Sequence, residues 1–109
     1  MRDDFQDNDR DILPETNVAT AMAKHILVKT REEAEQLKKQ LILGKSFEAL
    51  AKKHSTCPSK KKGGDLGEIR KGQLVKPVEK VIFTQPLKKI HGPVKSQFGF
   101  HLIQVYYRD

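Results

Sequence analysis

The hydrophobic pattern places strands near both ends of a folded unit. Residues 23–29 form a β-type run, and residues 99–107 form the longest and clearest strand of the chain. A short edge strand is expected at 66–69, and residues 92–95 are expected to be a turn that leads into a strand. Residues 55–65 combine proline, lysine and glycine, which predicts a loop or a short helical turn.

Three helices are predicted between these strands. The first covers about 31–43, with Thr30 as its N-cap and Gly44 as its end. Ser46 is expected to cap the second helix, and Pro77 to start the third. Their apolar faces are formed by residues at helical spacing, namely Ala34, Leu37 and Leu41; Phe47, Leu50 and Ala51; and Val78, Val81 and Ile82. The chain mixes strands and helices and shows no internal repeat.

Residues 1–21 differ from the remainder of the chain. Their few apolar residues follow no period, so this stretch is expected to be a disordered acidic N-terminal extension or a remnant of cloning. The domain is assigned to residues 22–109. With 109 residues, 37% hydrophobic composition and a mean hydropathy of -0.63, the sequence supports one small core and excludes a multidomain enzyme.

Charge is divided unevenly along the chain. Residues 1–21 hold two arginines and six acidic residues, a net charge of −4, whereas residues 22–109 hold 19 basic and eight acidic residues, a net charge of +11. A basic domain favours acidic partners and associates weakly with nucleic acid. The alternative interpretation is that the lysines solvate the surface, and the acidic extension is able to shield them.

The single cysteine, Cys57, excludes an intramolecular disulfide and a cysteine-based zinc site. The N-terminus shows no apolar segment of the secretory type, so a reducing, cytoplasmic location is expected.

Two histidines lie on the predicted strands. Because successive side chains of a strand point to opposite faces, His25 shares its face with Ala23 and Leu27. In the last strand, His101 shares its face with Ile103 and Val105. Both faces are apolar enough to point at a core, where an unpaired polar group costs about 1–3 kcal/mol. We therefore expect the two imidazoles to bond to each other or to a shared hydroxyl group.

Four stretches of the chain carry a family resemblance. They are His25-Ile26-Leu27-Val28-Lys29; Cys57-Pro58-Ser59 through Gly63-Gly64-Asp65-Leu66-Gly67; Lys71-Gly72-Gln73 with Pro77 and Phe83; and Gly92-Pro93-Val94 leading into Phe98-Gly99-Phe100-His101. In this order and spacing they resemble the parvulin family of peptidyl-prolyl cis/trans isomerases over residues 23–108. Each motif alone is weakly specific, but together they are strong, and the chain is most similar to the small stand-alone bacterial parvulins.

The resemblance implies an α+β fold, with a four-stranded antiparallel sheet surrounded by about four helices. It also implies an activity, which is rotation about the bond that precedes proline in peptides or unfolded proteins, and which assists folding. The expected enzyme is a cytoplasmic monomer that uses no cofactor and no metal. Its partners are proline-containing peptides and unfolded proteins, with no specific nucleic acid and no membrane among them.

The family's functional positions map onto eight residues of this chain. The resemblance assigns a catalytic network to His25, Cys57, His101 and Ser96. It assigns the pocket for the proline ring to Leu66, Leu74, Val78 and Phe98. Two pocket positions depart from the family pattern, because Leu74 stands where methionine is usual and Val78 where phenylalanine is usual. The second change removes much of a ring-packing wall, and it favours an alternative hypothesis of a catalytically weak binding module, or holdase, for unfolded chains.

Several chemical motifs have a second interpretation. Cys57 is a candidate nucleophile, but acyl transfer needs an oxyanion hole and an oriented base that the sequence does not supply. A small buried hydrophobe, or a polar group near the rotating amide, is the alternative. His54 and His91 are expected at the surface, and His54 with Cys57 provides too few ligands for a closed zinc site.

A run of three lysines occupies residues 60–62 of the loop that borders the expected cleft. It is interpreted as a solvated loop or as a device that steers acidic substrates. The short connection at residues 29–31 provides no phosphate-specific site of the kind found in phospho-dependent relatives.

Overall fold

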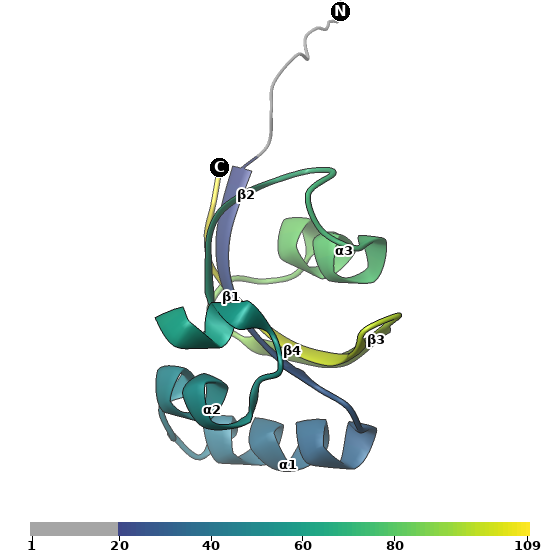
Figure 1. Ribbon diagram of the computed structural model, residues 1–109. Coiled ribbons are helices and arrows are strands. Elements are labelled where there is room, and N and C mark those ends of the chain that lie inside the picture. Colours follow the sequence, from purple (N-terminus) through teal and green to yellow (C-terminus); the bar gives the residue numbers. More distant parts are fainter. Residues whose placement is uncertain (1–19) are drawn as a thin grey trace, which may run out of the picture.

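The computed structural model describes residues 20–109 (Figure 1). The four strands form one antiparallel sheet in the order β2-β1-β4-β3, and they are β1 (Thr20–Val28), β2 (Asp65–Arg70), β3 (Ile90–Ser96) and β4 (Gly99–Arg108). The helical segments are α1 (Arg31–Ile42), α2 (Phe47–His54), the 3₁₀ helix η2 (Pro58–Lys62) and α3 (Lys76–Thr84). None of the helices between residues 20 and 109 has the length and apolarity needed to cross a bilayer.

The α+β class and the antiparallel four-stranded sheet are confirmed, but the expected number of helices is wrong. Residues 20–109 contain three α-helices rather than four, and the fourth helical segment is the five-residue 3₁₀ helix η2. Pro58 lies in its first turn, and Gly63 ends it in a left-handed conformation with φ 68°. A proline and a glycine five residues apart leave room for little more than one helical turn.

Strand β3 differs from its sequence prediction. Residues 92–95, expected to be a turn, lie inside β3, where the register with β4 shifts between His91 and Val94. Gly92 has φ 118°, and a Cβ at this position would lie 2.4 Å from the carbonyl oxygen of His101. Glycine is therefore required at this position, where β3 forms a bulge against β4. The reversal of the chain occurs after Ser96, at residues 97–98.

Strand β1 begins three residues before the expected start. Thr20 and Ala21, which the sequence analysis placed in the N-terminal extension, belong to the sheet, and Ala21 is completely buried. The remainder of the expected extension, residues 1–19, lies outside the described residues. The N–H of Asp109 donates to the carbonyl of Thr20 at 3.0 Å, so the start of β1 and the end of β4 are neighbours (Figure 1).

The predicted helix caps are present. Thr30 Oγ1 accepts the N–H of Glu33 at 3.2 Å, and Ser46 Oγ accepts the N–H of Ala49 at 3.1 Å. These bonds satisfy donors that the first turn of a helix leaves free. Gly44, with φ 100°, follows α1, and its N–H donates to a carbonyl of the last turn at 3.0 Å. Local sequence therefore sets the bounds of the first two helices.

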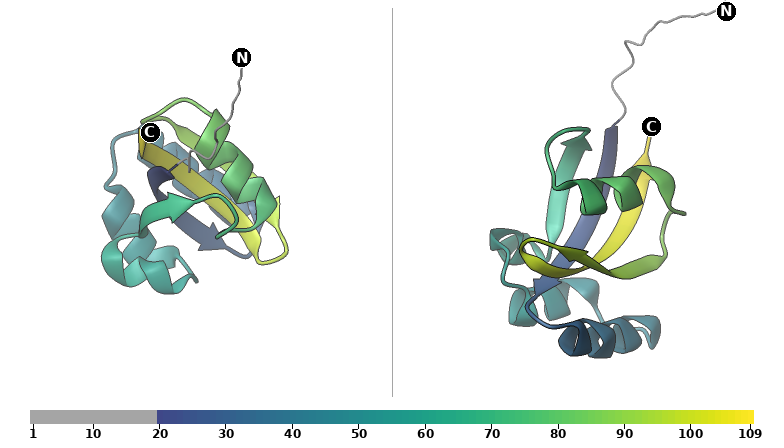
Figure 2. Two further views of the ribbon diagram at one scale, coloured as in Figure 1. Left: turned by 90° about the horizontal axis from the view of Figure 1, so that it is seen from above. Right: turned by 90° about the vertical axis from the view of Figure 1, so that its right-hand side faces the viewer.

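The sheet carries an apolar cluster on each face. On one face, which we name the α1/α2 face, the cluster consists of Ile26, Val28, Ala34, Leu37, Leu41, Phe47, Leu50, Ala51 and Leu102. On the other, the α3 face, it consists of Ala21, Ala23, Ile69, Val78, Ile82, Ile103 and Val105. Figure 2 shows α3 lying across one half of the sheet, away from α1 and α2. The alternation of side chains along β1 and β4 sends both histidines to the α3 face.

Candidate active site

The pairing of β1 with β4 brings the two predicted histidines together. His25 lies opposite Ile103, and His101 lies opposite Leu27, so the histidines are diagonal neighbours on one face. Their Nδ1 atoms are 3.3 Å apart, and the stacked rings have centroids 5.4 Å apart. The expectation that the two imidazoles bond to each other is confirmed by this geometry.

Ser96 extends the histidine pair to the end of β3. Its Oγ lies 2.6 Å from His101 Nε2 and accepts the N–H of Phe98 at 3.1 Å. Because the hydroxyl oxygen already accepts this N–H, its hydrogen is free to point at His101 Nε2. In the tautomer that accepts this bond, His101 carries its own proton on Nδ1, directed at His25. Ser96 thus orients one imidazole, and that imidazole orients the other.

Burial keeps the histidine pair neutral. His25 is 6% exposed and His101 is 3% exposed. Desolvation, followed by the nearby charge of His101, lowers the pKa of His25 to about 4, and desolvation also lowers the pKa of His101. Both rings are therefore uncharged at neutral pH. Within residues 20–109, the outer nitrogen of His25, Nε2, has no hydrogen-bond partner.

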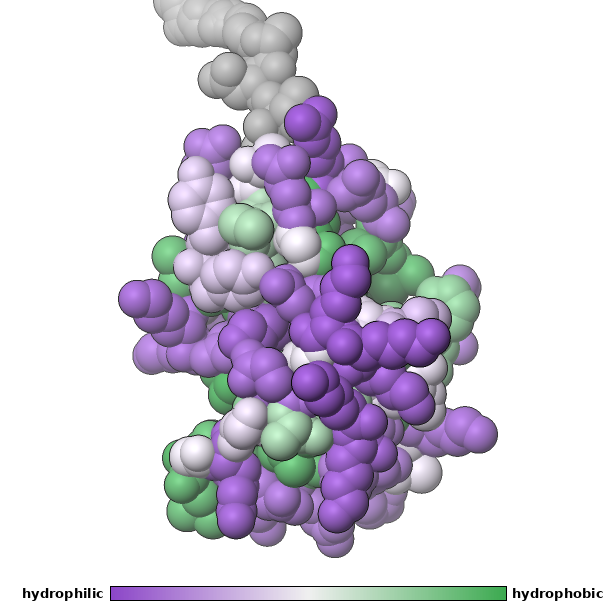
Figure 3. All heavy atoms as spheres, turned by 60° about the vertical axis from the view of Figure 1, so that its left-hand side comes forward, coloured by the Kyte–Doolittle hydropathy of each residue, from purple (hydrophilic) through white to green (hydrophobic). Residues whose placement is uncertain are grey.

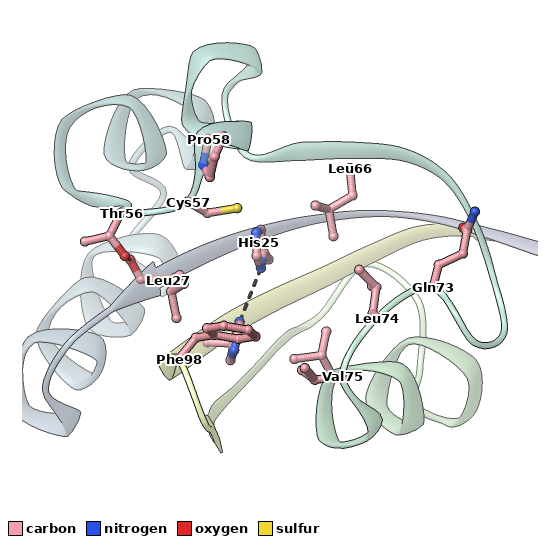
Figure 4. A pocket seen from close by; sticks show the side chains of 12 residues that line it. His25, Leu27, Thr56, Cys57, Pro58, Leu66, Gln73, Leu74, Val75 and Phe98 are labelled. Carbon is pink, nitrogen blue, oxygen red and sulfur yellow. Dashed lines mark hydrogen bonds between the residues drawn. The ribbon is translucent and has the colours of Figure 1, made fainter.

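A pocket of about 740 Å³ opens beside the histidines (Figure 4). It is lined by His25, Leu27, Thr56, Cys57, Pro58, Leu66, Gln73, Leu74, Val75, Val78, Phe98 and His101. Seven of the eight residues that the family resemblance singled out are among them, and the eighth, Ser96, contacts the site through His101. Most of the lining side chains are aliphatic or aromatic, so the pocket suits an apolar ring rather than a charged ligand.

Hydrogen bonds to β1 hold the loop that carries Cys57. Ser55 Oγ accepts the N–H of Leu27 at 3.1 Å and that of Cys57 at 3.3 Å. The N–H of Thr56 donates to the carbonyl of Leu27 at 2.8 Å. Cys57 is half-buried, and its sulfur lies in the open space above His25 (Figure 4). The cysteine therefore belongs to the pocket wall rather than to the core.

The opposite wall comes from β2, α3 and the connection between them. Gln73 Oε1 accepts the N–H of Arg70 at 2.7 Å, which closes the turn after β2 and places Leu74 against the pocket. Val78, in the first half of α3, is 2% exposed, and Val75 precedes the helix beside it. Leu74, Val75 and Val78 thus form an aliphatic wall of the pocket.

Phe98 forms the outer edge of the pocket. It stands in the turn between β3 and β4 and is 59% exposed. Its ring faces the space over the histidine pair (Figure 4). An aromatic ring that is left this open to solvent provides apolar surface for a bound chain.

The sequence analysis did not single out five lining residues, namely Leu27, Thr56, Pro58, Gln73 and Val75. Each is within two positions of a residue that it did single out. Leu27 follows His25 by two positions on the same strand face, which is the one signal that could have identified it. The others lie in loops, where sequence spacing does not determine the direction of a side chain.

The remaining candidates lie away from the pocket. His54 Nδ1 is 3.8 Å from Glu33 Oε2, and His91 Nε2 is 2.8 Å from the carbonyl oxygen of Pro86. Both histidines are partly exposed. Between residues 20 and 109, no three His, Cys, Asp or Glu side chains are grouped as metal ligands.

The family model described as "Rotamase: PPIC-type PPIASE domain" matches residues 12–106. The chain belongs to this family. The predicted membership among the parvulin-type prolyl isomerases is thus confirmed. The match includes most of the expected domain and extends ten residues before its assigned start at residue 22.

The PPIC-type domain is similar to both long and short proteins. It is 48% identical over 84 residues to the foldase protein PrsA 1 of Bacillus cereus, which covers 76% of this chain and 29% of the foldase. A crystal structure of PrsA from Bacillus anthracis matches with a TM-score of 0.81 and 38% identity, over 84% of this chain and 43% of that one. NmPin, the parvulin of Nitrosopumilus maritimus, matches with a TM-score of 0.74 and 37% identity, over 81% of this chain and 96% of NmPin. The chain spans about three tenths of the length of the curated foldases that it matches.

Proposed function

We propose that this PPIC-type domain catalyses cis/trans isomerisation of X-Pro bonds in peptides and unfolded proteins, without a covalent intermediate. The observation that carries the proposal is an apolar pocket directly beside a neutral, mutually bonded histidine pair. Foldase relatives of high identity support the same activity. The domain is proposed to assist folding, because slow X-Pro isomerisation limits the folding of many chains.

The reaction requires only that an amide be twisted. Resonance in the C–N bond opposes this rotation by about 18–20 kcal/mol. A catalyst accelerates it by binding the twisted amide more tightly than either planar form, at about tenfold per 1.4 kcal/mol of preference. No bond to the protein forms, and no leaving group departs, so Cys57 has no need to act as a nucleophile.

The residues of the pocket suit this task. Leu66, Leu74 and Val78 offer an apolar recess for the pyrrolidine ring, and the chain on the other side of the bond remains free to rotate. A dry environment disfavours the charge-separated resonance form that makes the amide planar. In this proposal the histidines act through shape and hydrogen bonding, because a pKa of about 4 keeps the His25 ring neutral.

Exchange spectroscopy by NMR on a short X-Pro peptide tests the activity directly. The protein is expected to increase the cis/trans exchange rate in proportion to its concentration. His101→Ala, which removes the Nδ1 partner of His25, is expected to lower kcat/KM at least tenfold. His54→Ala is the matched control, because His54 lies outside the pocket, and it is expected to leave kcat/KM unchanged. An exchange rate that does not respond to added protein would overturn the proposal.

A holdase module is the second candidate function. The exposed Phe98 ring and the aliphatic wall at Val78 favour binding of unfolded chains without tight complementarity to one proline conformation. In this case the protein would suppress aggregation of an unfolded client while the exchange rate of the peptide stayed flat. The sequence-based expectations of a cytoplasmic location, a monomeric state and no specific nucleic-acid partner stay predictions.

A further inference from the structure

One side of the molecule concentrates positive charge next to the pocket. Five exposed lysines lie on the adjoining helices α2 and η2, and we name them the lysine face: Lys52, Lys53, Lys60, Lys61 and Lys62. The two helices touch closely, since a Cβ at Gly63 would lie 2.7 Å from Glu48 Cγ. This side of the molecule is mostly hydrophilic (Figure 3). Pro58, the first residue of η2, lines the pocket, so the lysine face borders the pocket entrance.

The acidic residues of the described part do not neutralise this face. Within residues 20–109 the ion pairs are Lys24 with Glu48, and His54 with Glu33 if the histidine is protonated. None of the five lysines forms an ion pair with an acidic side chain of this range. Residues 20–109 carry a net charge of +11, and residues 1–19 carry a net charge of −4.

Residues 1–19 also contain a bond of the kind that the pocket suits. The chain has five prolines, and Pro14 is the one that lies outside residues 20–109. Leu13 precedes it, so an apolar side chain accompanies the proline ring. Five aspartates stand between three and eleven positions before Pro14, at Asp3, Asp4, Asp7, Asp9 and Asp11.

The chain is long enough to place Pro14 in the pocket. Thr20 lies six positions after Pro14, which gives a reach of about 20 Å. His25 lies five residues along β1 from Thr20, or about 17 Å. Charge, chain length and pocket chemistry therefore agree on one occupant.

We propose that the pocket and the lysine face bind the chain's own acidic segment, residues 1–19, with the Leu13–Pro14 bond in the pocket as an intramolecular substrate. This inference rests on the proposed isomerase function for the turnover of that bond, but not for the binding of the segment. A tethered segment has an effective concentration in the millimolar range. A segment with a dissociation constant near 1 mM would thus raise the apparent KM for an added peptide about twofold.

Binding of the segment is tested by NMR on the full chain. In the variant Asp3→Asn, Asp4→Asn, Asp7→Asn, Asp9→Asn and Asp11→Asn, the amide signals of Thr56, Cys57 and residues 60–62 are expected to shift. The same signals should shift in the unmodified chain when the ionic strength rises from about 0.02 M to about 0.5 M, because salt screens exposed charges. Unchanged signals in both experiments would overturn the proposal.

Lysine variants locate the contact. Lys60→Gln, Lys61→Gln and Lys62→Gln together are expected to lower the apparent KM for an added peptide about twofold, because the segment no longer competes. Lys88→Gln with Lys89→Gln is the matched control from the loop between α3 and β3, and it should leave the KM unchanged. An equal change of the apparent KM in both variants would contradict specific binding of the segment to the lysine face. Signal shifts that vanish on tenfold dilution would mean that the segment binds a second copy, which overturns the intramolecular form.

Turnover of the Leu13–Pro14 bond separates this inference from the proposed function. Exchange spectroscopy on the Glu15 amide is expected to show cis/trans exchange at least about 100-fold faster in the full chain than in a peptide of residues 8–20, whose uncatalysed exchange takes tens to hundreds of seconds. If an added X-Pro peptide exchanges rapidly and Leu13–Pro14 does not, the inference fails and the function stands. If neither exchanges, the isomerase function fails, and the signal shifts alone decide whether the segment binds.

Discussion

The α1/α2 face and the α3 face share the strands β1 and β4, and they differ in how much of each strand a helix covers. On the α1/α2 face, Ile26, Val28 and Leu102 lie fully buried beneath two helices. On the α3 face, a single helix of nine residues, about 13 Å long, covers the half that contains Ile103. His25 and His101 lie on this face and, together with Val78 of α3, line the pocket. Both faces thus carry a buried cluster, and the pocket lies on the face that has a single helix.

The largest expected effect is a loss of stability when a buried side chain is removed from the α1/α2 face. Ile26 is 0% exposed, and Ile26→Ala is expected to lower the free energy of unfolding by about 2–5 kcal/mol, because a cavity remains that the two helices cannot fill. Urea unfolding measures this change. Ile42→Ala, at a position that is 67% exposed, is the control and should change stability by less than about 0.5 kcal/mol. Equal effects would mean that the α1/α2 face is not a tightly packed core.

The next largest effect concerns the α3 face, where we expect the stability of the protein to depend on pH. His25 titrates near pH 4 in the folded protein and near 6.5 in the unfolded chain, so between these values the unfolded chain binds more protons. Its contribution is therefore complete above about pH 6.5 and is lost as the pH falls toward 4, by at most about 3 kcal/mol. Urea unfolding between pH 4 and 7.5 measures this profile. A His25→Leu variant should give a flatter profile, and an identical slope in both proteins would contradict the assignment.

A substitution in the wall of the pocket, at Val78, is expected to increase catalytic activity. Val78→Phe is expected to raise kcat/KM for an X-Pro peptide about tenfold, within the 1–3 kcal/mol that pocket complementarity typically contributes. An aromatic ring at this position narrows the recess around the pyrrolidine. Val81→Phe places the same residue on α3 outside the pocket lining and should leave kcat/KM unchanged. No gain at Val78 would indicate that Leu74 and Val75 already supply the wall.

The smallest expected effect concerns a pair of serines. Ser96→Ala removes the partner of His101 Nε2 and of the Phe98 N–H, and it should cost about 1 kcal/mol and lower kcat/KM about fivefold. Ser59→Ala is matched to it, because the buried Ser59 Oγ has no hydrogen-bond partner within residues 20–109. Its removal should leave unfolding and kcat/KM nearly unchanged. Two variants of equal activity would show that Ser96 does not orient the histidines.

The histidine pair was predictable because two independent constraints pointed to it. The alternation along each strand sends His25 and His101 to apolar faces, and a buried imidazole needs a partner. The register that makes them diagonal neighbours was not predictable, because a bulge in β4 shifts the pairing after Met22. The family resemblance supplied the identity of the pocket residues, which spacing alone does not give.

The errors arose where tertiary structure overrides a local signal. Gly92 and Pro93 are typical of a turn, but here they form a bulge inside β3 against the carbonyl of His101. Ala21 has too small a side chain to mark a strand, but β2 and β4 enclose it completely. Contacts that are distant in sequence decided each case.

The hydrogen bond between Asp109 and Thr20 joins the residue that follows β4 to the first residue of β1. The start of β1 and the end of β4 therefore lie at one corner of the domain, on the side away from α1 (Figure 1). A domain whose termini lie close together can be inserted between two neighbouring residues of a longer polypeptide, because the insertion separates those residues only slightly. This geometry suits a module that makes up a minor share of long foldases and nearly the whole of a short parvulin.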